Sequence, residues 1–367
     1  MQINKIFLSN FRNLAEQEIP FYQNVNYIYG KNAQGKTNLI ESIFLLANSK
    51  SFKTNKIVDY INWEEEEANL AIDISNSITN HTLSLNIKKR KKNFLLNNKQ
   101  ITSIIDYLGK LIVVCFTPDD LSLIKGEPQI RRKFIDRHCV DLNPSFMKTL
   151  VDYSRAIKSK NIILKSEGAS KEMLFAWNKV LAKLIFDIIN KREVFLKKLS
   201  IKLNETHQEF AKVDGHISLK IISNLSENHQ DLSIEDINLK LNSEVDRELK
   251  AKRSILGTHR DELKIFYSNK DAKFFASQGQ SRSLALSLKF AVVSLIEETI
   301  NDSPVILLDD LDSELDSERV SSLFNFLYKK QRQIFITGTS IRDSLKYEMP
   351  SESGVFYIEQ GKIIQEK

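Results

Sequence analysis

One stretch of the chain has the residue types and spacing of a phosphate-binding loop. It matches the pattern G-x-x-x-x-G-K-[ST] and consists of Gly30, Lys31, Asn32, Ala33, Gln34, Gly35, Lys36 and Thr37. The two glycines allow backbone conformations in which successive N–H groups face one phosphate chain. The Lys36 ammonium would neutralise the β- and γ-phosphate oxygens, and the Thr37 hydroxyl would hold Mg²⁺. We therefore predict that the chain binds a nucleoside triphosphate with Mg²⁺.

The residues on either side predict the strand and the helix that such a loop needs. Residues 26–29 are typical of a strand that enters the loop, and residues 38–47 carry apolar side chains at helical spacing. The helix would direct its positive N-terminal end at the same anion. An accidental match is the alternative, and this context argues against it.

A second segment could complete the metal site. Residues 305–308 are wholly apolar, as in a buried strand of a parallel sheet, and Asp309 and Asp310 follow them directly. Ligands of open α/β sheets bind at the carboxyl ends of strands, so we expect Asp309 to reach the Mg²⁺ held by Thr37. Asp310 would face the attacking water as the general base. The alternative is a strand followed by an acidic turn, because residues 312–316 contain three more carboxylates.

A third segment predicts another anion-binding surface. Ser277, Gly279 and Gln280 come just before the helical run 284–296. A hydroxyl, a backbone N–H and a helix N-terminus would together favour an anion. Since one loop already binds the phosphates, we expect this surface to serve the nucleotide of another subunit. A plain helix N-cap is the alternative.

Bulk properties exclude some classes of protein. With 367 residues, of which 42% are hydrophobic, the chain can form a full α/β domain and a second lobe. A net charge of +6 is compatible with a polyanionic partner but is also common in soluble proteins. Cys115 and Cys139 are too few for a disulfide framework, and Cys115 lies in an apolar run that predicts a buried thiol. We see no signal peptide and no membrane-length apolar stretch, so we expect a cytoplasmic protein without a membrane partner.

The order of expected elements suggests a discontinuous domain. Strand patterns dominate up to residue 116, helical patterns follow, and α/β patterns return after about residue 255. We therefore predict one ATPase domain, formed by residues 1–116 with 256–367, that is interrupted by a helical lobe at 117–255. Five consecutive cations, Lys88 to Lys92, fall between two expected strands. They could form a solvated turn or a finger that contacts phosphates, and the sequence favours neither.

These motifs, in this order, resemble the ABC-type ATPase head of transporters and chromosome-maintenance proteins. More closely, the chain resembles the RecF family of bacterial recombination mediators. The segments that carry this resemblance are residues 11–14, 30–37, 116–121, 125–126, 131–134, Tyr153 with 158–165, 257–262, 277–282 and 307–316. They span the chain from end to end.

The resemblance implies a fold and a set of site residues. The implied fold class is α/β, an ABC-type P-loop ATPase head with a mixed sheet and an inserted helical lobe. It further implies that residues 30–37 bind ATP and that Thr37 and Asp309 bind Mg²⁺. Ser277, Gly279 and Gln280 would contact the γ-phosphate across an ATP-dependent homodimer. Arg12 and Asn13 would lie near the nucleotide.

The resemblance also implies a function. Such proteins bind single- and double-stranded DNA and gaps, and with RecR and RecO they help to load RecA in recombinational repair and replication restart. The resemblance also implies that DNA stimulates ATP hydrolysis. Hydrolysis should be slow, because Asp310 is shorter than the glutamate of transporter relatives. Lys53 replaces an arginine of the family, and the segment around Gly338 lacks the histidine of transporters.

Two other classes of ATPase share such a head. A transport ATPase subunit would need a membrane partner and has no need of the inserted lobe. An ATPase of another chromosome-maintenance or defence system is the second alternative, although the chain lacks a long heptad arm and an evident nuclease-like metal cluster.

Overall fold

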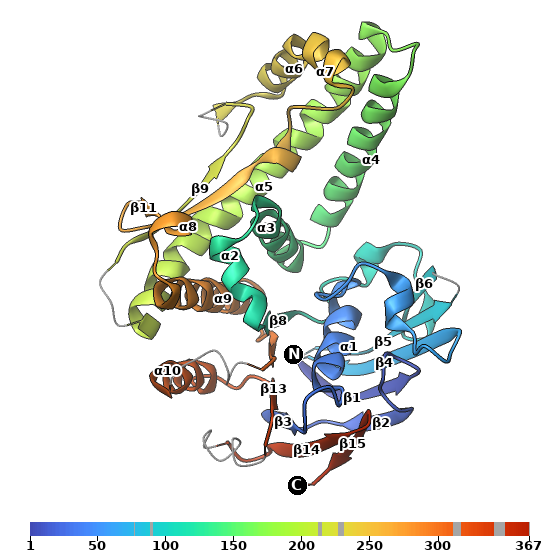
Figure 1. Cartoon of the computed structure of the whole chain (residues 1–367), viewed down its shortest axis with the longest axis vertical. Coiled ribbons are helices and arrows are strands. Elements are labelled where there is room, and N and C mark those ends of the chain that lie inside the picture. Colours follow the sequence, from blue (N-terminus) through green and yellow to red (C-terminus); the bar gives the residue numbers. More distant parts are fainter. Residues whose placement is uncertain are drawn as a thin grey trace. The chain divides into compact units, whose positions relative to one another are not determined.

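The computed structural model describes residues 1–76, 78–88, 91–211, 215–226, 231–310, 317–340 and 349–366 (Figure 1). The chain divides into two compact units. Unit 1 consists of Met1–Asp120, Thr206–Val213 and Ala285–Lys367, and unit 2 consists of Leu121–Glu205 and Asp214–Leu284. The first division lies close to the boundary expected at residue 116. The return to the first unit was expected at residue 256, whereas residues 256–284 lie in unit 2.

The sheet that carries the phosphate-binding loop lies in unit 1. Its strand order is β15-β14-β3-β13-β12-β8. The strands are β3 (Val25–Tyr29), β8 (Val113–Phe116), β12 (Val305–Leu308), β13 (Ile334–Gly338), β14 (Gly354–Glu359) and β15 (Lys362–Gln365). All neighbours are parallel except β14 and β15, which are antiparallel, so the sheet is mixed as expected. The four buried residues of β12 explain its wholly apolar sequence.

A second sheet of unit 1 is antiparallel, in the order β2-β1-β4-β5-β6-β7. Its strands are β1 (Gln2–Ser9), β2 (Gln17–Pro20), β4 (Glu67–Ser75), β5 (Asn80–Lys88), β6 (Lys91–Leu96) and β7 (Lys99–Gln100). Buried and half-buried residues alternate along β4, as the period of a strand with one core face requires. Helix α1 (Lys36–Asn48) buries Leu39, Ile40 and Ile43 in a core that includes residues of both sheets. Helix α10 (Ser317–Tyr328) completes the unit.

Unit 2 is built mainly from helices. They are α2 (Ser122–Lys125), α3 (Pro128–Leu142), α4 (Phe146–Lys165), α5 (Lys171–Ala211), α6 (Ile234–Ser243), α7 (Val245–Ala251) and α8 (Ala272–Phe275). Helix α5 is unbroken over 41 residues and extends into unit 1, as does α9 (Gln278–Ile300). The helical patterns expected after residue 116 agree with these helices, but the small sheet of this unit was not predicted. That sheet joins β9 (Ile217–Ile222), β10 (Glu262–Tyr267) and β11 (Lys270–Asp271).

Short 3-10 helices connect several of these elements, among them η1 (Ile57–Tyr60). Cys115 and Cys139 are both buried free thiols, as expected for Cys115. Among the described residues, no helix combines the length and the apolar character that crossing a bilayer would take.

Candidate nucleotide and metal site

The phosphate-binding loop links β3 to α1 in a conformation that its glycines make accessible. Gly35 has a φ of 119°, and Ala33 has a φ of 64°, so both lie in the left-handed region. A Cβ on Gly30 would lie 2.3 Å from the carbonyl oxygen of Ile358 in β14, which leaves no room for a side chain. The strand, the loop and the helix therefore stand in the order that the sequence predicted.

Lys36 folds back over this loop. Its Nζ donates to the carbonyl oxygens of Gly30, at 2.7 Å, and of Lys31, at 2.9 Å. Burial lowers the pKa of Lys36 from its ordinary value, while the carboxylates of Asp310 and Asp309 act in the opposite direction. The ammonium is thus placed at the loop and partly stripped of water, where phosphate oxygens could take over its hydrogen bonds.

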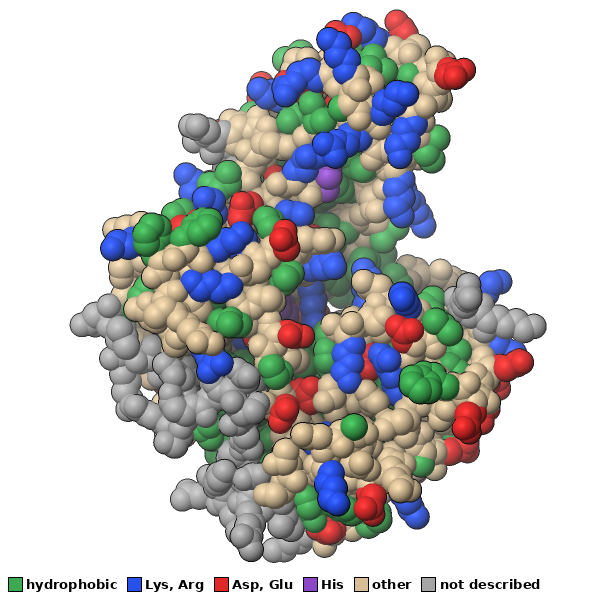
Figure 2. Space-filling model, in the orientation of Figure 1, with side chains coloured by type: hydrophobic (Ala, Val, Ile, Leu, Met, Phe, Trp, Pro, Cys, Tyr) green, Lys and Arg blue, Asp and Glu red, His purple; other side chains and the backbone are tan. Residues whose placement is uncertain are grey.

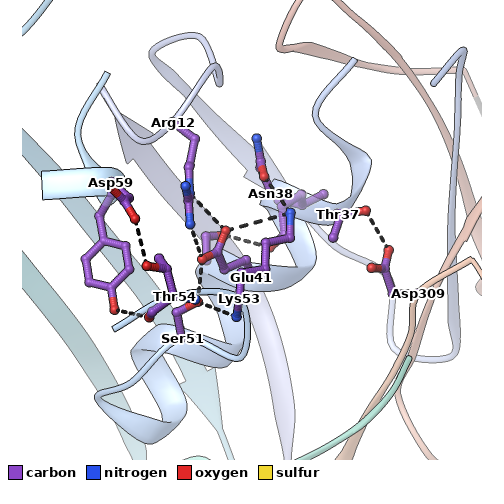
Figure 3. A network of polar contacts seen from close by, with 12 residues as sticks. Arg12, Thr37, Asn38, Glu41, Ser51, Lys53, Thr54, Asp59 and Asp309 are labelled. Carbon is purple, nitrogen blue, oxygen red and sulfur yellow. Dashed lines mark hydrogen bonds and ion pairs between the residues drawn. The ribbon is translucent and has the colours of Figure 1, made fainter. Parts of the chain in front are cut away.

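Thr37 and Asp309 meet at the carboxyl end of β12. The Thr37 hydroxyl donates to Asp309 Oδ1 at 3.0 Å, although 272 residues separate them (Figure 3). Asp309 is buried, and its burial raises its pKa; the hydroxyls of Thr337 and Thr37, as hydrogen-bond donors, lower it. A hydroxyl and a carboxylate oxygen are ligands that Mg²⁺ accepts, and Mg²⁺ commonly takes few protein ligands beside substrate phosphates. These two residues therefore fit the ion that the sequence predicted.

Thr337, at the end of β13, connects the two aspartates. Its hydroxyl donates to Asp309 Oδ1 at 2.9 Å and accepts the backbone N–H of Asp310 at 2.9 Å. Asp310 has a φ of 50°, an uncommon conformation for a residue with a side chain. The position of Asp310 beside the metal residues agrees with the predicted general base, and that role stays a prediction. Residues 312–316, in the predicted acidic turn, lie outside the described residues.

A network around Glu41 of α1 borders the loop (Figure 3). The Arg12 guanidinium binds the Glu41 carboxylate with two hydrogen bonds, from Nε at 3.0 Å and from Nη2 at 2.6 Å. Glu41 is fully buried, and it also accepts the Ser51 hydroxyl and lies 3.9 Å from Lys53 Nζ. Arg12 is thus engaged by a carboxylate, and its place near the nucleotide stays a prediction.

The network continues into the phosphate-binding loop through amide side chains. Lys53 Nζ donates to Asn38 Oδ1 at 2.8 Å, and Asn38 Nδ2 donates to Asn13 Oδ1 at 2.7 Å. Asn13 in turn donates to the carbonyl oxygen of Ala33 at 3.3 Å. Asn13 therefore contacts the loop directly. Sequence reasoning missed Glu41 and Asn38. For Glu41, the only signal is a charged residue on the buried face of the helix, whereas Asn38 is half-buried and gives no such signal.

The segment around Ser277 belongs to unit 2 and caps α9. The Ser277 hydroxyl accepts the Gln280 N–H at 3.2 Å, and the Gln280 side chain accepts the Ser277 N–H at 2.9 Å. This reciprocal pair is a capping box. Ser277 and Gln280 are exposed and Gly279 is half-buried. The N-cap geometry is therefore present, while contact with a nucleotide stays a prediction.

Lys125 of α2 holds the turn that precedes Ser277. Its Nζ donates to the carbonyl oxygens of Lys273 at 2.9 Å and Ala276 at 2.7 Å, and more weakly to that of Ala272 at 3.3 Å. These carbonyls lie at the end of α8, where a cation is also favoured by the helix dipole. Lys125 thus fixes the start of the Ser277 segment.

The cationic hairpin between β5 and β6 is partly neutralised. Lys88 forms an ion pair with Glu67 at 2.8 Å. Lys92 Nζ donates to the Ser49 carbonyl oxygen at 2.7 Å and lies 5.6 Å from the centroid of the Tyr60 ring. Burial lowers the pKa of Lys92. Lys91 is exposed, whereas Lys89 and Arg90 lie outside the described residues.

Known proteins match this chain over its full length. The family model described as the RecF/RecN/SMC N terminal domain matches residues 2–364. A DNA replication and repair protein RecF from Geotalea uraniireducens (strain Rf4) is 32% identical over 99% of this chain and 100% of its own length. The protein of the same name from Enterococcus faecalis (strain ATCC 700802 / V583) is 33% identical over 99% and 98%.

Solved structures agree with these sequence matches. The recombination mediator protein RecF with ATP, in the RecFOR pathway, superimposes with a TM-score of 0.91 at 29% identity and covers 100% of this chain and 97% of its own. A Smc head bound to the C-winged helix domain of ScpA shares the fold, with a TM-score of 0.57 at 17% identity and coverage of 100% and 98%. The matched folds are those of ABC-type ATPase heads, as the sequence predicted. From its motifs, its fold and its relatives, this chain belongs to the RecF family of DNA replication and repair proteins.

Proposed function

We propose that this protein is an ATP-operated dimeric switch that binds DNA during recombinational repair and replication restart. The observation that carries the proposal is the hydrogen bond of 3.0 Å between Thr37 and Asp309, which joins the phosphate-binding loop to the end of β12. With Lys36 on the same loop, this pair forms the protein's share of a Mg²⁺–ATP site. A full-length relative that was solved with ATP supports the choice of nucleotide.

The proposed chemistry is slow hydrolysis of ATP. A bound Mg²⁺ would supply positive charge to the β- and γ-phosphate oxygens. Lys36 would exchange its loop carbonyl partners for phosphate oxygens, and Asp309 would stay ionised to hold the metal. Asp310, whose backbone is tied to Thr337, would accept a proton from the attacking water. Because the aspartate side chain is short, we expect its hold on that water to be loose and turnover to be slow.

The proposed switch is a homodimer in which each subunit completes the other's site. Ser277, Gly279 and Gln280 stand at the N-terminus of the 23-residue helix α9, with the Ser277 hydroxyl and Gln280 exposed. A γ-phosphate held by the loop of a second copy would find N–H groups and the positive helix end there. ATP binding then favours association, and loss of the γ-phosphate favours dissociation.

The proposed setting follows from the relatives. They are DNA replication and repair proteins, and a solved relative is described as part of the RecFOR pathway. We extend to this chain the binding of single- and double-stranded DNA and gaps, RecR and RecO as partners, and help in loading RecA. We also propose that DNA stimulates hydrolysis and that the protein is cytoplasmic. Unit 1 would be the ATPase domain and unit 2 the inserted lobe.

Sedimentation velocity with ATP, with ADP and with gapped DNA tests this proposal. We expect a dimer with ATP that binds DNA, and a monomer with ADP. Lys36→Ala should abolish the ATP-dependent dimer, whereas the matched variant Asp310→Asn should keep the dimer and slow hydrolysis. A Lys36→Ala protein that dimerises like the wild type would refute the switch. Indifference to DNA, together with stimulation of hydrolysis by a membrane partner, would favour a transport ATPase subunit.

A further inference from the structure

In the part of the chain that the structure describes, two sets of aromatic side chains are strongly exposed. In unit 1, Trp63 is 100% exposed, in the turn that follows η1. In unit 2, the neighbours Phe274 and Phe275 of α8 are 71% and 68% exposed. Large aromatic side chains gain most from burial, so rings left in water commonly mark a surface that another molecule covers. Figure 2 shows apolar side chains bordered by Lys and Arg over α8 and β11.

The two surfaces carry opposite charge. Lys270 Nζ lies 6.0 Å from the centroid of the Phe275 ring, and Lys273 Nζ lies 5.7 Å from that of Phe274. Trp63 is followed by Glu64, Glu65 and Glu66, all exposed. A basic aromatic surface and an acidic aromatic surface are complementary. The three glutamates would also repel the phosphates of DNA, which makes a nucleic acid a poor partner for Trp63.

Each surface adjoins a segment that the proposed dimer uses. Phe274 and Phe275 precede Ser277 by three and two residues, in the turn that Lys125 holds. Trp63 follows Asn62, whose N–H donates to the carbonyl oxygen of Asn10 at 2.8 Å. Asn13, at most about 11 Å further along the chain, contacts the phosphate-binding loop at Ala33.

These separations fit the size of an interface. A standard interface covers about 800 Å² on each partner, which corresponds to a disc of roughly 16 Å radius. A dimer that is centred on the shared phosphates would therefore cover Phe274–Phe275, which lie at most about 11 Å along the chain from Ser277, while Trp63 of the other subunit would lie toward the edge of the interface. Such a dimer is two-fold symmetric, so the contact would occur twice.

We propose that Phe274 and Phe275 of one copy pack against Trp63 of a second copy in the ATP-bound dimer. Lys270 and Lys273 then face Glu64, Glu65 and Glu66 of that copy. This inference rests on the proposed function, since it names the partner surface of the same dimer. The aromatic contact adds affinity beyond the phosphate-mediated contacts. The facing charges fix the relative position of the two subunits.

Site-specific cross-linking tests the contact directly. The native cysteines, Cys115 and Cys139, are buried, so new surface cysteines can be addressed selectively. A Trp63→Cys chain is mixed with a Phe275→Cys chain and treated with a short bismaleimide. The mixed dimer keeps one native contact and places both cysteines in the other. We expect a cross-linked heterodimer with ATP and none with ADP, and none when Leu239→Cys, exposed on α6, replaces Phe275→Cys.

Dimer affinity provides the second measurement. Trp63→Ala, or Phe274→Ala with Phe275→Ala, should raise the dimer dissociation constant at least about thirtyfold, as loss of an aromatic anchor does. Lys270→Glu with Lys273→Glu should weaken the dimer, and Glu64→Lys with Glu65→Lys should restore it in the combined chain. Leu239→Ala serves as the exposed control. Binding of a fluorescent ATP analogue to the monomer should be unchanged in every variant, which shows that the fold and the loop are intact.

The outcomes separate the two proposals. If the wild type stays monomeric with ATP, the proposed dimeric switch is wrong and the proposed aromatic contact is excluded as well. If the wild type dimerises while the aromatic variants keep its dissociation constant and no cross-link forms, the contact alone is wrong. If the aromatic variants lose DNA affinity but dimerise normally, the rings contact nucleic acid and the inference is overturned.

Discussion

Replacing Arg12 by alanine should destabilise the protein before any nucleotide is bound. The change removes both hydrogen bonds from a guanidinium that is 20% exposed to a carboxylate that is fully buried. Removal of one partner from a buried pair costs about 3–5 kcal/mol, because the other charge is left uncompensated. Since Ser51 and Lys53 still contact Glu41, we expect the lower end of that range, about 3 kcal/mol.

This free energy converts into a measurable melting temperature. The usual entropy of unfolding, over 367 residues, amounts to about 0.8 kcal/mol/K, so the loss should lower the melting temperature by about 4 °C. Differential scanning calorimetry of the nucleotide-free protein would measure it. Lys5→Ala, which removes exposed ion pairs with Glu18 and Asp73, is the control, and its melting temperature should stay close to that of the wild type.

A double variant separates the two roles that Arg12 could have. Arg12→Met with Glu41→Met replaces the pair by apolar side chains, which is often close to neutral for stability, so melting should return to within about 1 °C of the wild type. If Arg12 also contacts the nucleotide, ATP affinity will stay low in this double variant. An Arg12→Ala protein that melts like the wild type but binds ATP poorly would refute the buried-pair argument.

Three further predictions concern Asp309, Lys125 and His259. Burial raises the pKa of Asp309, so the folded state disfavours the ionised carboxylate. The stability gained by keeping this carboxyl protonated in the folded state is complete below about pH 3.8 and is lost as the pH rises. Asp309→Asn should therefore melt above the wild type at pH 7, should lose this advantage in acid, and should lose Mg²⁺-dependent hydrolysis; a lower melting temperature at pH 7 would contradict the argument. Lys125→Met should weaken ATP-dependent dimerisation in sedimentation without changing ATP binding by the monomer, whereas the exposed control Lys133→Met should do neither; equal dimerisation would show that the three carbonyls need no clamp. Burial, with Arg260 nearby, lowers the pKa of His259 to about 4, so the folded state keeps it neutral and stability should fall as pH drops from about 6.5 to 4. His259→Gln should flatten this part of the plot of urea midpoint against pH. An unchanged slope would show that His259 does not cause the loss of stability.

Local features of the site could be predicted because neighbouring residues determine them. A strand, two glycines and a helix within residues 25–48 are set by short-range geometry, and the structure has them in place. The meeting of Thr37 with Asp309 could be predicted as well, because parallel strands end at the same edge of a sheet. The helix N-cap at Ser277 is another local feature.

Other partners that come from distant parts of the chain could not be predicted. Thr337 joins the two aspartates only because β13 lies beside β12. In the sequence, Glu41 is one polar residue of an amphipathic helix. Its hydrogen bonds with Arg12 and Ser51 depend on the folded arrangement of the chain. Lys92 belongs to a run of cations in the sequence, yet in the structure it is half-buried and contacts the Tyr60 ring and the Ser49 carbonyl oxygen.

The small sheet of unit 2 could not be predicted from the sequence for a related reason. The α/β pattern expected after about residue 255 agrees with strand β10, but its partner β9 is a six-residue strand in a region of helical sequence. Pairing between residues 217–222 and 262–267 joins two segments that are far apart along the chain. Without that pairing, β10 was assigned to the ATPase domain instead of unit 2.

The glycine at position 338 limits how this site could evolve. A Cβ there would lie 1.9 Å from the hydroxyl oxygen of Tyr27, a fully buried side chain. A transporter-like histidine could therefore enter only together with a smaller residue at position 27. Either change alone would create a clash or a cavity, so a lineage that gained faster hydrolysis by this route would have to pass through a less stable intermediate. The slow turnover that we propose would then be preserved by packing as well as by selection for function.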